Sequence, residues 1–195
     1  MRFADIKEKL KTKSVAIAGC GGLGSNAAVA LARVGVGKLI IADDDVIEEG
    51  NLNRQYYFYD QIGKPKAPSL KQNIARINPA VDVAAHIVKL GPKEVLDLFS
   101  GCDVILEAFD KSAMKEMIIE TVLSTLPNMP IVSGVGMAGW GGNESITIRH
   151  SGNLHLVGDG VSEASENNPP LAPRVGIVSN MMANIALELL LGKDR

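Results

Sequence analysis

One stretch decides the fold: Val15-Ala16-Ile17-Ala18-Gly19-Cys20-Gly21-Gly22-Leu23-Gly24-Ser25. Its first four residues are an apolar run typical of a buried strand, and residues 25–34 have the length and composition of a helix. Gly19, Gly21 and Gly24 have the GxGxxG spacing between the two. Glycine lets a phosphate approach the backbone closely, and the N-terminus of a helix attracts anions. The stretch therefore predicts a strand, a turn and a helix that together bind nucleotide phosphates.

Apolar strand-like runs alternate with helix-length segments along most of the remaining chain. The expected strands are residues 15–18, 39–42, 81–87, 104–106 and 131–135. The expected helices are residues 25–34, 67–77, 94–99, 114–126 and 175–191. A glycine-rich loop over 134–142 precedes a hairpin of 145–149 and 154–157, and a long loop covers 158–173. We expect a single domain, residues 1–195, with an α/β Rossmann-like fold: a doubly wound, mostly parallel sheet with helices on both faces.

An acidic residue stands where a nucleotide site of this kind needs one. Asp43 follows the second expected strand, nineteen residues beyond Gly24, and a carboxylate at this place can accept hydrogen bonds from ribose hydroxyls. The plainer interpretation is that the glycine turn is only a tight connection and that residues 43–45 are a solvated acidic loop. It does not explain why the turn and the acid are spaced as a nucleotide site requires. A nicotinamide-dependent oxidoreductase would begin in the same way, so these features leave the nucleotide open.

Further motifs follow in order along the chain: Asn51-Leu52-Asn53-Arg54-Gln55, Gly63-Lys64-Pro65-Lys66 and Ile77-Asn78-Pro79. With the glycine turn they resemble the ubiquitin-activating-enzyme superfamily, specifically the bacterial ThiF and MoeB type, over about the first three-quarters of the chain. The resemblance implies an adenylyltransferase. Such an enzyme uses ATP and Mg²⁺ to activate the terminal glycine carboxylate of a small ubiquitin-like sulfur carrier protein ending in Gly-Gly, and it releases pyrophosphate.

The resemblance also assigns roles to residues. Those implied to bind ATP are Gly19, Gly21, Gly22, Leu23, Gly24, Asp43, Asp45, Asn51, Arg54, Gln55 and Lys66. Arg54, Lys66 and Asp110 would be catalytic, and Asp110 would also hold the Mg²⁺. The chemistry agrees with these assignments, because attack of a carboxylate on the α-phosphate builds negative charge that fixed cations stabilise. Arginine suits bidentate phosphate contacts, and lysine acts as a compact point charge.

The sequence departs from the family pattern in three places. Glu107-Ala108-Phe109-Asp110-Lys111 replaces the usual Asp followed by Thr-Asp-Asn, which puts an extra cation beside Asp110. No CxxC pair is present and the three histidines are not spaced to replace one, so we predict no zinc. Cys20 and Cys102 are expected to be small buried side chains. The reaction is therefore expected to stop at the acyl adenylate.

The last quarter carries less specific signals. Trp140 either covers the adenylate and an extended glycine tail or fills a gap in the fold. Pro169-Pro170-Leu171-Ala172-Pro173-Arg174-Val175-Gly176 before an apolar helix resembles compact ThiF proteins, which implies the thiazole branch of thiamine biosynthesis rather than the molybdopterin branch. A homodimer is implied as well, with Arg2 the candidate to reach a partner's site, whereas Arg33 is expected to face solvent.

Composition excludes several classes of function. With 20 basic and 22 acidic residues the net charge is -2, so no broad cationic surface for nucleic acid or anionic lipid is expected. Two cysteines without CxxC spacing, and no signal-like or uninterrupted apolar segment, favour a cytoplasmic protein without a membrane span. Two alternatives remain: an NAD(P)-dependent oxidoreductase, which leaves Arg54 and Lys66 unexplained, and a non-catalytic nucleotide-binding scaffold, suggested by the altered segment 107–111.

Overall fold

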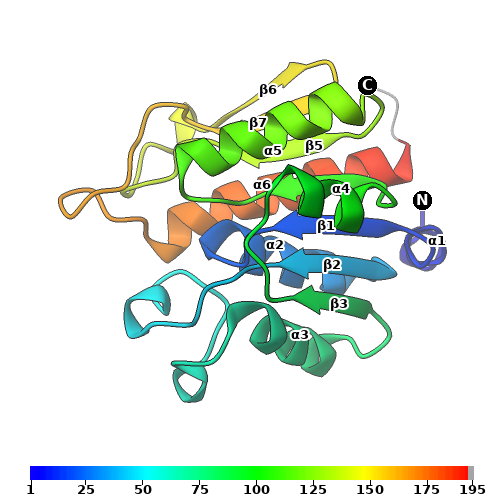
Figure 1. Cartoon of the computed structure of the whole chain (residues 1–195), viewed down its shortest axis with the longest axis horizontal. Coiled ribbons are helices and arrows are strands. Elements are labelled where there is room, and N and C mark those ends of the chain that lie inside the picture. The colour runs from blue at the N-terminus through cyan, green and yellow to red at the C-terminus, as the bar shows by residue number, and fades with distance from the viewer. Residues whose placement is uncertain (193–195) are drawn as a thin grey trace.

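The computed structural model describes residues 1–192, which form one seven-stranded sheet. The strands are β1 (Ser14–Ala18), β2 (Lys38–Ala42), β3 (Asp82–His86), β4 (Val104–Glu107), β5 (Ile131–Gly134), β6 (Thr147–Ser151) and β7 (Leu154–Gly158). Their order is β3-β2-β1-β4-β5-β7-β6, and all neighbours are parallel except β6 and β7. This confirms the predicted α/β, mostly parallel sheet (Figure 1).

Helices cover both faces of the sheet. One face carries α2 (Gly22–Val34), α3 (Lys66–Ile77) and α6 (Ala172–Leu191), and the other carries α4 (Pro92–Phe99) and α5 (Ser112–Thr125) (Figure 1). The chain winds outward from β1 through β2 to β3, then crosses to β4 on the other side of β1. The strand order therefore reverses between β1 and β4. In open α/β sheets ligands bind at such a switch point, beyond the carboxyl ends of the strands.

The sequence of β1 shows why two layers form. Val15 and Ile17 lie in the core beneath α2 and α6, whereas Ala16 and Ala18 lie in the second core with Phe99. All four side chains are fully buried, because successive residues of a strand point to opposite faces and helices cover both. The first core also takes in α6. This helix is long and apolar enough to cross a membrane, but half of its apolar stretch is buried inside the molecule.

Two differences from the sequence-based expectations have clear causes. A first helix, α1 (Phe3–Leu10), was not expected, because only Leu10 among its residues is fully buried and charged residues obscure the helical period. The hairpin strand β6 begins at Thr147 rather than 145, since a short 3₁₀ turn, η3 (Asn143–Ser145), precedes it. Every residue of β6 is exposed at the sheet edge, so apolar alternation could not mark where it starts.

Candidate functional site

The glycine turn lies at the switch point, and its geometry requires glycine. Gly19 has φ +93°, in the left-handed region. A Cβ there would lie 3.1 Å from the carbonyl oxygen of Ala108, the residue that follows β4. A Cβ on Gly24 would collide with the carbonyl oxygen of Gly19. Gly21 is the N-cap of α2, so the glycine turn leads directly into the N-terminus of this helix, the end that attracts anions. Leu23 is buried, and its side chain packs against Gly134 of β5.

Asp43 connects the end of β2 to this turn. Its Oδ2 accepts a hydrogen bond from the backbone N–H of Cys20 at 2.6 Å, and its Oδ1 accepts one from Asp45 N–H at 2.8 Å. Burial raises the pKa of Asp43 from its ordinary value, opposed by these two amide donors and by Lys66. A carboxylate oxygen has lone pairs to spare after one hydrogen bond. Asp43 can therefore hold the turn in shape and still accept a ribose hydroxyl.

Lys66 and Asp45, which the family resemblance implies bind the nucleotide, form an ion pair with each other. Lys66 is the first residue of α3, its side chain is 8% exposed, and its Nζ lies 2.8 Å from Asp45 Oδ2. The backbone N–H of Lys66 also donates to the carbonyl of Asp45 at 3.0 Å. The Asp45 side chain is 67% exposed and can turn into solvent. The Lys66 ammonium group could therefore exchange the Asp45 carboxylate for another anion.

Arg54 lies over the glycine turn. Its Nη1 donates to the carbonyl of Gly50 at 3.2 Å and to Asn53 Oδ1 at 2.8 Å, and its Cγ lies 3.4 Å from where a Gly22 Cβ would be. Arg54 is half-buried, and its guanidinium fork has further N–H groups to offer. The arginine stem thus covers the start of α2 while its head remains available for an anion.

The two amides of the same motif behave differently. Asn51 Oδ1 accepts a hydrogen bond from Glu48 N–H, so this side chain shapes the 3₁₀ turn η1 (Glu49–Asn51). Gln55 is buried with its Nε2 facing Gly21, and its Oε1 has no hydrogen-bond partner within residues 1–192. Buried polar groups are almost always paired. The buried Oε1 of Gln55 is therefore an acceptor that a ligand could satisfy.

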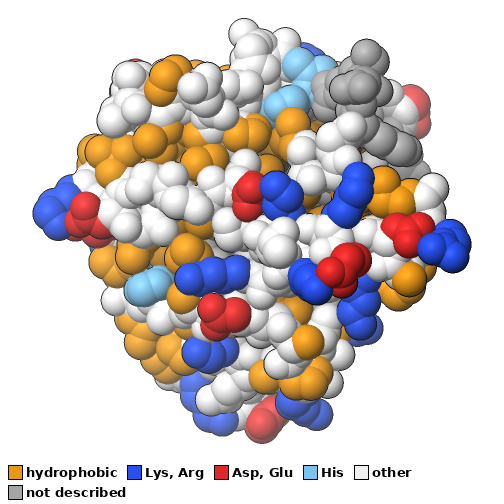
Figure 2. Space-filling model, turned by 90° about the vertical axis from the view of Figure 1, so that its right-hand side faces the viewer, with side chains coloured by type: hydrophobic (Ala, Val, Ile, Leu, Met, Phe, Trp, Pro, Cys, Tyr) orange, Lys and Arg blue, Asp and Glu red, His pale blue; other side chains and the backbone are white. Residues whose placement is uncertain are grey.

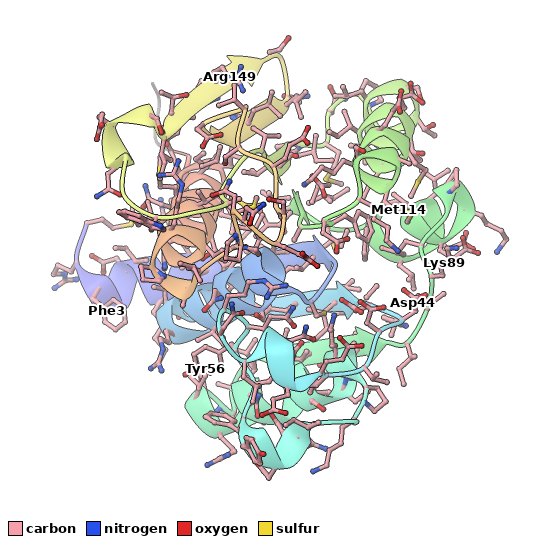
Figure 3. All side chains as sticks on the ribbon, turned by 90° about the vertical axis from the view of Figure 1, so that its left-hand side faces the viewer. Phe3, Asp44, Tyr56, Lys89, Met114 and Arg149 are labelled. Atoms are coloured by element: carbon pink, nitrogen blue, oxygen red, sulfur yellow. The ribbon has the colours of Figure 1, made fainter. Side chains whose placement is uncertain are left out.

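Asp110 follows β4 at the same edge of the sheet. Its carboxylate is exposed and makes no hydrogen bond or ion pair with the described residues. Figure 3 looks onto this edge, where Asp44 follows the end of β2 and Met114 lies in the first turn of α5. Carboxylate oxygens of Asp43, Asp44 and Asp45 lie within 4.8 Å of one another, the one group of three or more possible ligands found in residues 1–192. The predicted place of Mg²⁺ at Asp110 stays a prediction.

Glu107, in the segment that departs from the family pattern, is a buried anchor. Its carboxylate is fully buried at the end of β4 and accepts hydrogen bonds from Lys115 Nζ at 2.9 and 3.1 Å. Ser133 of β5 and the backbone N–H of Phe109 also donate to it. The Lys115 ammonium reaches the carbonyl of Gly134 at 2.8 Å as well. This network fixes β4 to β5 and sets the direction in which the chain continues to Asp110.

A second buried ion pair braces the loops beside the turn. Arg174, near the start of α6, binds Asp159 Oδ2 at 2.7 Å, and the two side chains are 7% and 5% exposed. Its guanidinium also donates to the carbonyls of Gly141 and Gly142. Hydrogen bonds therefore join the loop 135–142 to the loop that follows β7. Motif spacing did not reveal this pair, because its members lie fifteen residues apart on different elements.

Trp140 lies between the glycines of the braced loop and is 86% exposed. The expectation that it could fill a gap in the fold is wrong, because a gap-filling side chain would be buried. The loop that follows β7 contacts the motif of residues 51–55, since Asn53 Nδ2 donates to the carbonyl of Pro170 at 3.2 Å. A backbone bridge between Gly139 and Pro170 joins the Trp140 loop to that neighbouring loop. The expectation that Trp140 covers the adenylate stays a prediction.

Both cysteines are buried, as expected from the sequence. Burial raises the pKa of the Cys20 thiol well above its ordinary value and raises the pKa of Cys102 to about 11. The thiolate is the nucleophilic form of cysteine. Neither side chain is therefore a ready nucleophile.

The opposite face of the molecule carries charges of both signs among the described residues. Figure 2 shows this face, where Lys and Arg side chains are interspersed with Asp and Glu. Nucleic-acid binding depends on clustered positive charge. The mixture of signs on this face does not supply such a cluster.

A sequence model of the ThiF family matches residues 3–195. Among curated relatives, adenylyltransferase and sulfurtransferase UBA4 of Saccharomyces cerevisiae (strain ATCC 204508 / S288c) is 30% identical over 195 residues, covering 94% of this chain and 43% of the relative. "Probable adenylyltransferase/sulfurtransferase MoeZ" of Mycobacterium tuberculosis (strain CDC 1551 / Oshkosh) is 36% identical over 131 residues, covering 67% of this chain and 33% of the relative. The chain thus spans less than half the length of these two proteins.

Solved structures share the fold. The E. coli tRNA N6-threonylcarbamoyladenosine dehydratase in complex with ATP has a TM-score of 0.86 at 20% identity, covering 96% of this chain and 89% of that one. E. coli MccB with succinimide has a TM-score of 0.73 at 21% identity, covering 95% and 58%. At this identity the likeness shows the fold alone. With the family match over almost its whole length and a relative at 30% identity, the chain belongs to the ThiF family.

Proposed function

We propose that this protein is an ATP-dependent adenylyltransferase, acting as a single domain on a small ubiquitin-like carrier protein that ends in Gly-Gly. The observation that carries the proposal is the meeting of three features at the switch point. The glycine turn offers a phosphate site, Asp43 offers an acceptor for the ribose, and Arg54 and Lys66 supply two cations beside them. A dinucleotide site accounts for the first two features and leaves both cations without a role.

The proposed reaction builds up negative charge, which the cationic residues of the site stabilise. A carboxylate oxygen of the carrier's terminal glycine attacks the α-phosphorus of ATP, and the bond from that phosphorus to the bridging oxygen breaks. Pyrophosphate leaves with the electron pair, and the carrier becomes an acyl adenylate. Arg54 and Lys66 stabilise the charge that grows on the α-phosphate and on pyrophosphate. Mg²⁺, bound when the nucleotide is, would neutralise further phosphate charge, and the unpaired carboxylate of Asp110 is of the right chemical type to hold it.

We assign adenylation alone to this chain. The names of UBA4 and MoeZ join an adenylyltransferase to a sulfurtransferase, but the chain spans less than half of either protein. Sulfur transfer through a cysteine needs an accessible thiolate, and both cysteines here are buried with raised pKa values. We further propose a cytoplasmic homodimer without zinc. The resemblance of residues 169–176 to compact ThiF proteins favours a ThiS-like carrier over a molybdopterin carrier.

A pyrophosphate-exchange assay tests the proposal. Labelled pyrophosphate and ATP are incubated with the protein and with a ThiS-like or a molybdopterin-type carrier, each tested intact and without its terminal Gly-Gly. Exchange with one intact carrier and none with the truncated form is expected. Absence of carrier-dependent exchange would refute adenylation, and carrier binding without exchange would favour a scaffold. Saturable binding of NADH with none of ATP would favour an oxidoreductase.

A further inference from the structure

Tyr57 is buried beside the glycine turn and has no part in the proposed chemistry. It is 7% exposed, and its hydroxyl donates a hydrogen bond to the backbone carbonyl of Cys20 at 2.8 Å. The carbonyl of Lys66 lies 3.4 Å from the same hydroxyl. Burial raises the pKa of Tyr57 far above its ordinary value, so the hydroxyl keeps its proton and remains a donor. A buried donor thus meets the middle of the phosphate-binding turn from within the core.

This hydrogen bond fixes the direction of a backbone N–H. The carbonyl of Cys20 and the N–H of Gly21 belong to one peptide group, and in a trans peptide the two point in opposite directions. Because Tyr57 holds the carbonyl toward the core, the Gly21 N–H points away from it. Within residues 1–192 this N–H donates no hydrogen bond, and Gly21 is half-buried at the N-cap of α2. The free N–H is therefore directed to where an anion can bind.

Such a peptide needs a restraint because of the residues around it. Gly21 and Gly22 have no Cβ, so the backbone there can adopt many conformations, and the peptide could turn over. Cys20 is held on both sides: its N–H donates to Asp43 at 2.6 Å, and its carbonyl accepts from Tyr57. The Asp43 bond orients the peptide before Cys20. Among residues 1–192, the Tyr57 bond is the one that orients the peptide after it.

We propose that Tyr57 is a positioning residue that holds the peptide between Cys20 and Gly21 so that the Gly21 N–H binds a phosphate oxygen. The identity of the ligand as ATP rests on the proposed function. The positioning role rests on the hydrogen bond and the peptide geometry, and it concerns phosphate binding alone. Recognition of the adenosine moiety does not pass through this peptide, because Asp43 is held by other donors.

The test compares Tyr57→Phe, which removes only the hydroxyl, with Tyr59→Phe, whose hydroxyl belongs to a side chain that is 73% exposed. Calorimetry measures the affinity of each protein for ATP and for adenosine. Tyr57→Phe is expected to weaken ATP binding about 10-fold, the loss of one phosphate contact, and to leave adenosine binding unchanged. NMR follows the Gly21 amide, whose proton should shift downfield with ATP in the parent and not in Tyr57→Phe. Tyr59→Phe should behave as the parent in both measurements.

Two results would overturn the inference: unchanged ATP affinity in Tyr57→Phe, or an equal loss for ATP and adenosine, which a purely structural role would produce. Either result leaves the proposed function standing as long as the parent binds ATP. If the parent binds no ATP, the proposed function fails. Inorganic pyrophosphate then serves as the probe, and a Gly21 shift in the parent that is lost in Tyr57→Phe still supports the positioning role, whereas equal shifts refute it.

Discussion

Replacing Arg174 by Met tests the brace that holds the loops beside the glycine turn. The substitution keeps an unbranched apolar side chain near the start of α6 but removes the guanidinium. Asp159 would keep its two hydrogen bonds from the backbone N–H groups of Val161 and Ser162, both at 2.8 Å. It would lose its one ion-pair partner among the described residues, with its side chain only 5% exposed. An uncompensated charge would then lie inside the protein.

The expected cost follows from this burial. Breaking a buried pair by removing one partner costs about 3–5 kcal/mol. The carbonyls of Gly141 and Gly142 that Arg174 also binds belong to exposed residues and can be hydrated, so the low end applies. A loss of about 3 kcal/mol in a domain of this size lowers Tm by roughly 6–12 °C. Adding Asp159→Asn should recover part of this loss, because the amide oxygen keeps both backbone hydrogen bonds while the buried charge disappears.

Thermal and urea unfolding of the two single variants, the double variant and the parent measure this coupling. The matched control is Lys93→Met, which breaks a pair whose side chains are 81% and 58% exposed and should cost less than about 1 kcal/mol. The reasoning is refuted if Arg174→Met costs no more than this control. It is also refuted if Asp159→Asn adds its full cost in the Arg174→Met background, since the two sites would then be energetically independent.

Three further predictions concern the nucleotide site and pH. Lys66→Met should lower carrier-dependent pyrophosphate exchange at least about 10-fold. Unfolding measurements should show a loss of less than about 1 kcal/mol, because the partner carboxylate of Asp45 is already 67% exposed; unchanged exchange would contradict its role. Asp43→Asn should weaken ATP and adenosine binding alike in calorimetry, because it disturbs both the ribose acceptor and the bond to Cys20; a loss confined to ATP would argue against ribose binding. Burial raises the pKa of Asp159, but hydrogen bonds from backbone N–H groups and from Arg174 outweigh it and lower this pKa. The ionised carboxylate therefore contributes fully to stability above its unfolded pKa of about 3.9, and this contribution is lost as pH falls. The Tm difference between the parent and Asp159→Asn should therefore be constant from about pH 5 to pH 7 and shrink below about pH 4, whereas a difference that grows there would contradict this sign.

Much of the fold could be predicted because its central strands β1, β4 and β5 are buried on both faces. Continuous apolar runs such as residues 15–18 and 104–106 then mark these strands, and the glycine turn marks where α2 starts. The helix α1 could not be found in this way. Few of its residues are buried, and contacts with α6 that no local pattern encodes hold it in place. The start of β6 was missed for the same reason, since no apolar face distinguishes it from the preceding turn.

The site was predicted as a set of residue types, but not as a set of partners. The pairing of Lys66 with Asp45 depends on how the loop between β2 and α3 folds back, and spacing says nothing about it. The same holds for Glu107 with Lys115, whose partnership forms only when β4 and α5 pack together. A signal for Glu107 does exist: it is a charged residue directly continuing a buried apolar strand, where an unpaired charge would be costly. Such a residue predicts a buried partner without naming it.

Intact mass spectrometry of the carrier tests the central claim most directly. The protein, ATP, Mg²⁺ and a carrier ending in Gly-Gly are incubated with inorganic pyrophosphatase, which hydrolyses the released pyrophosphate. The mass of the carrier is then measured at once. The account predicts a carrier heavier by one adenylyl group. This species should form much more slowly with Lys66→Met and not at all when the terminal Gly-Gly is removed. A carrier that stays unmodified while the parent binds both ATP and carrier would contradict it.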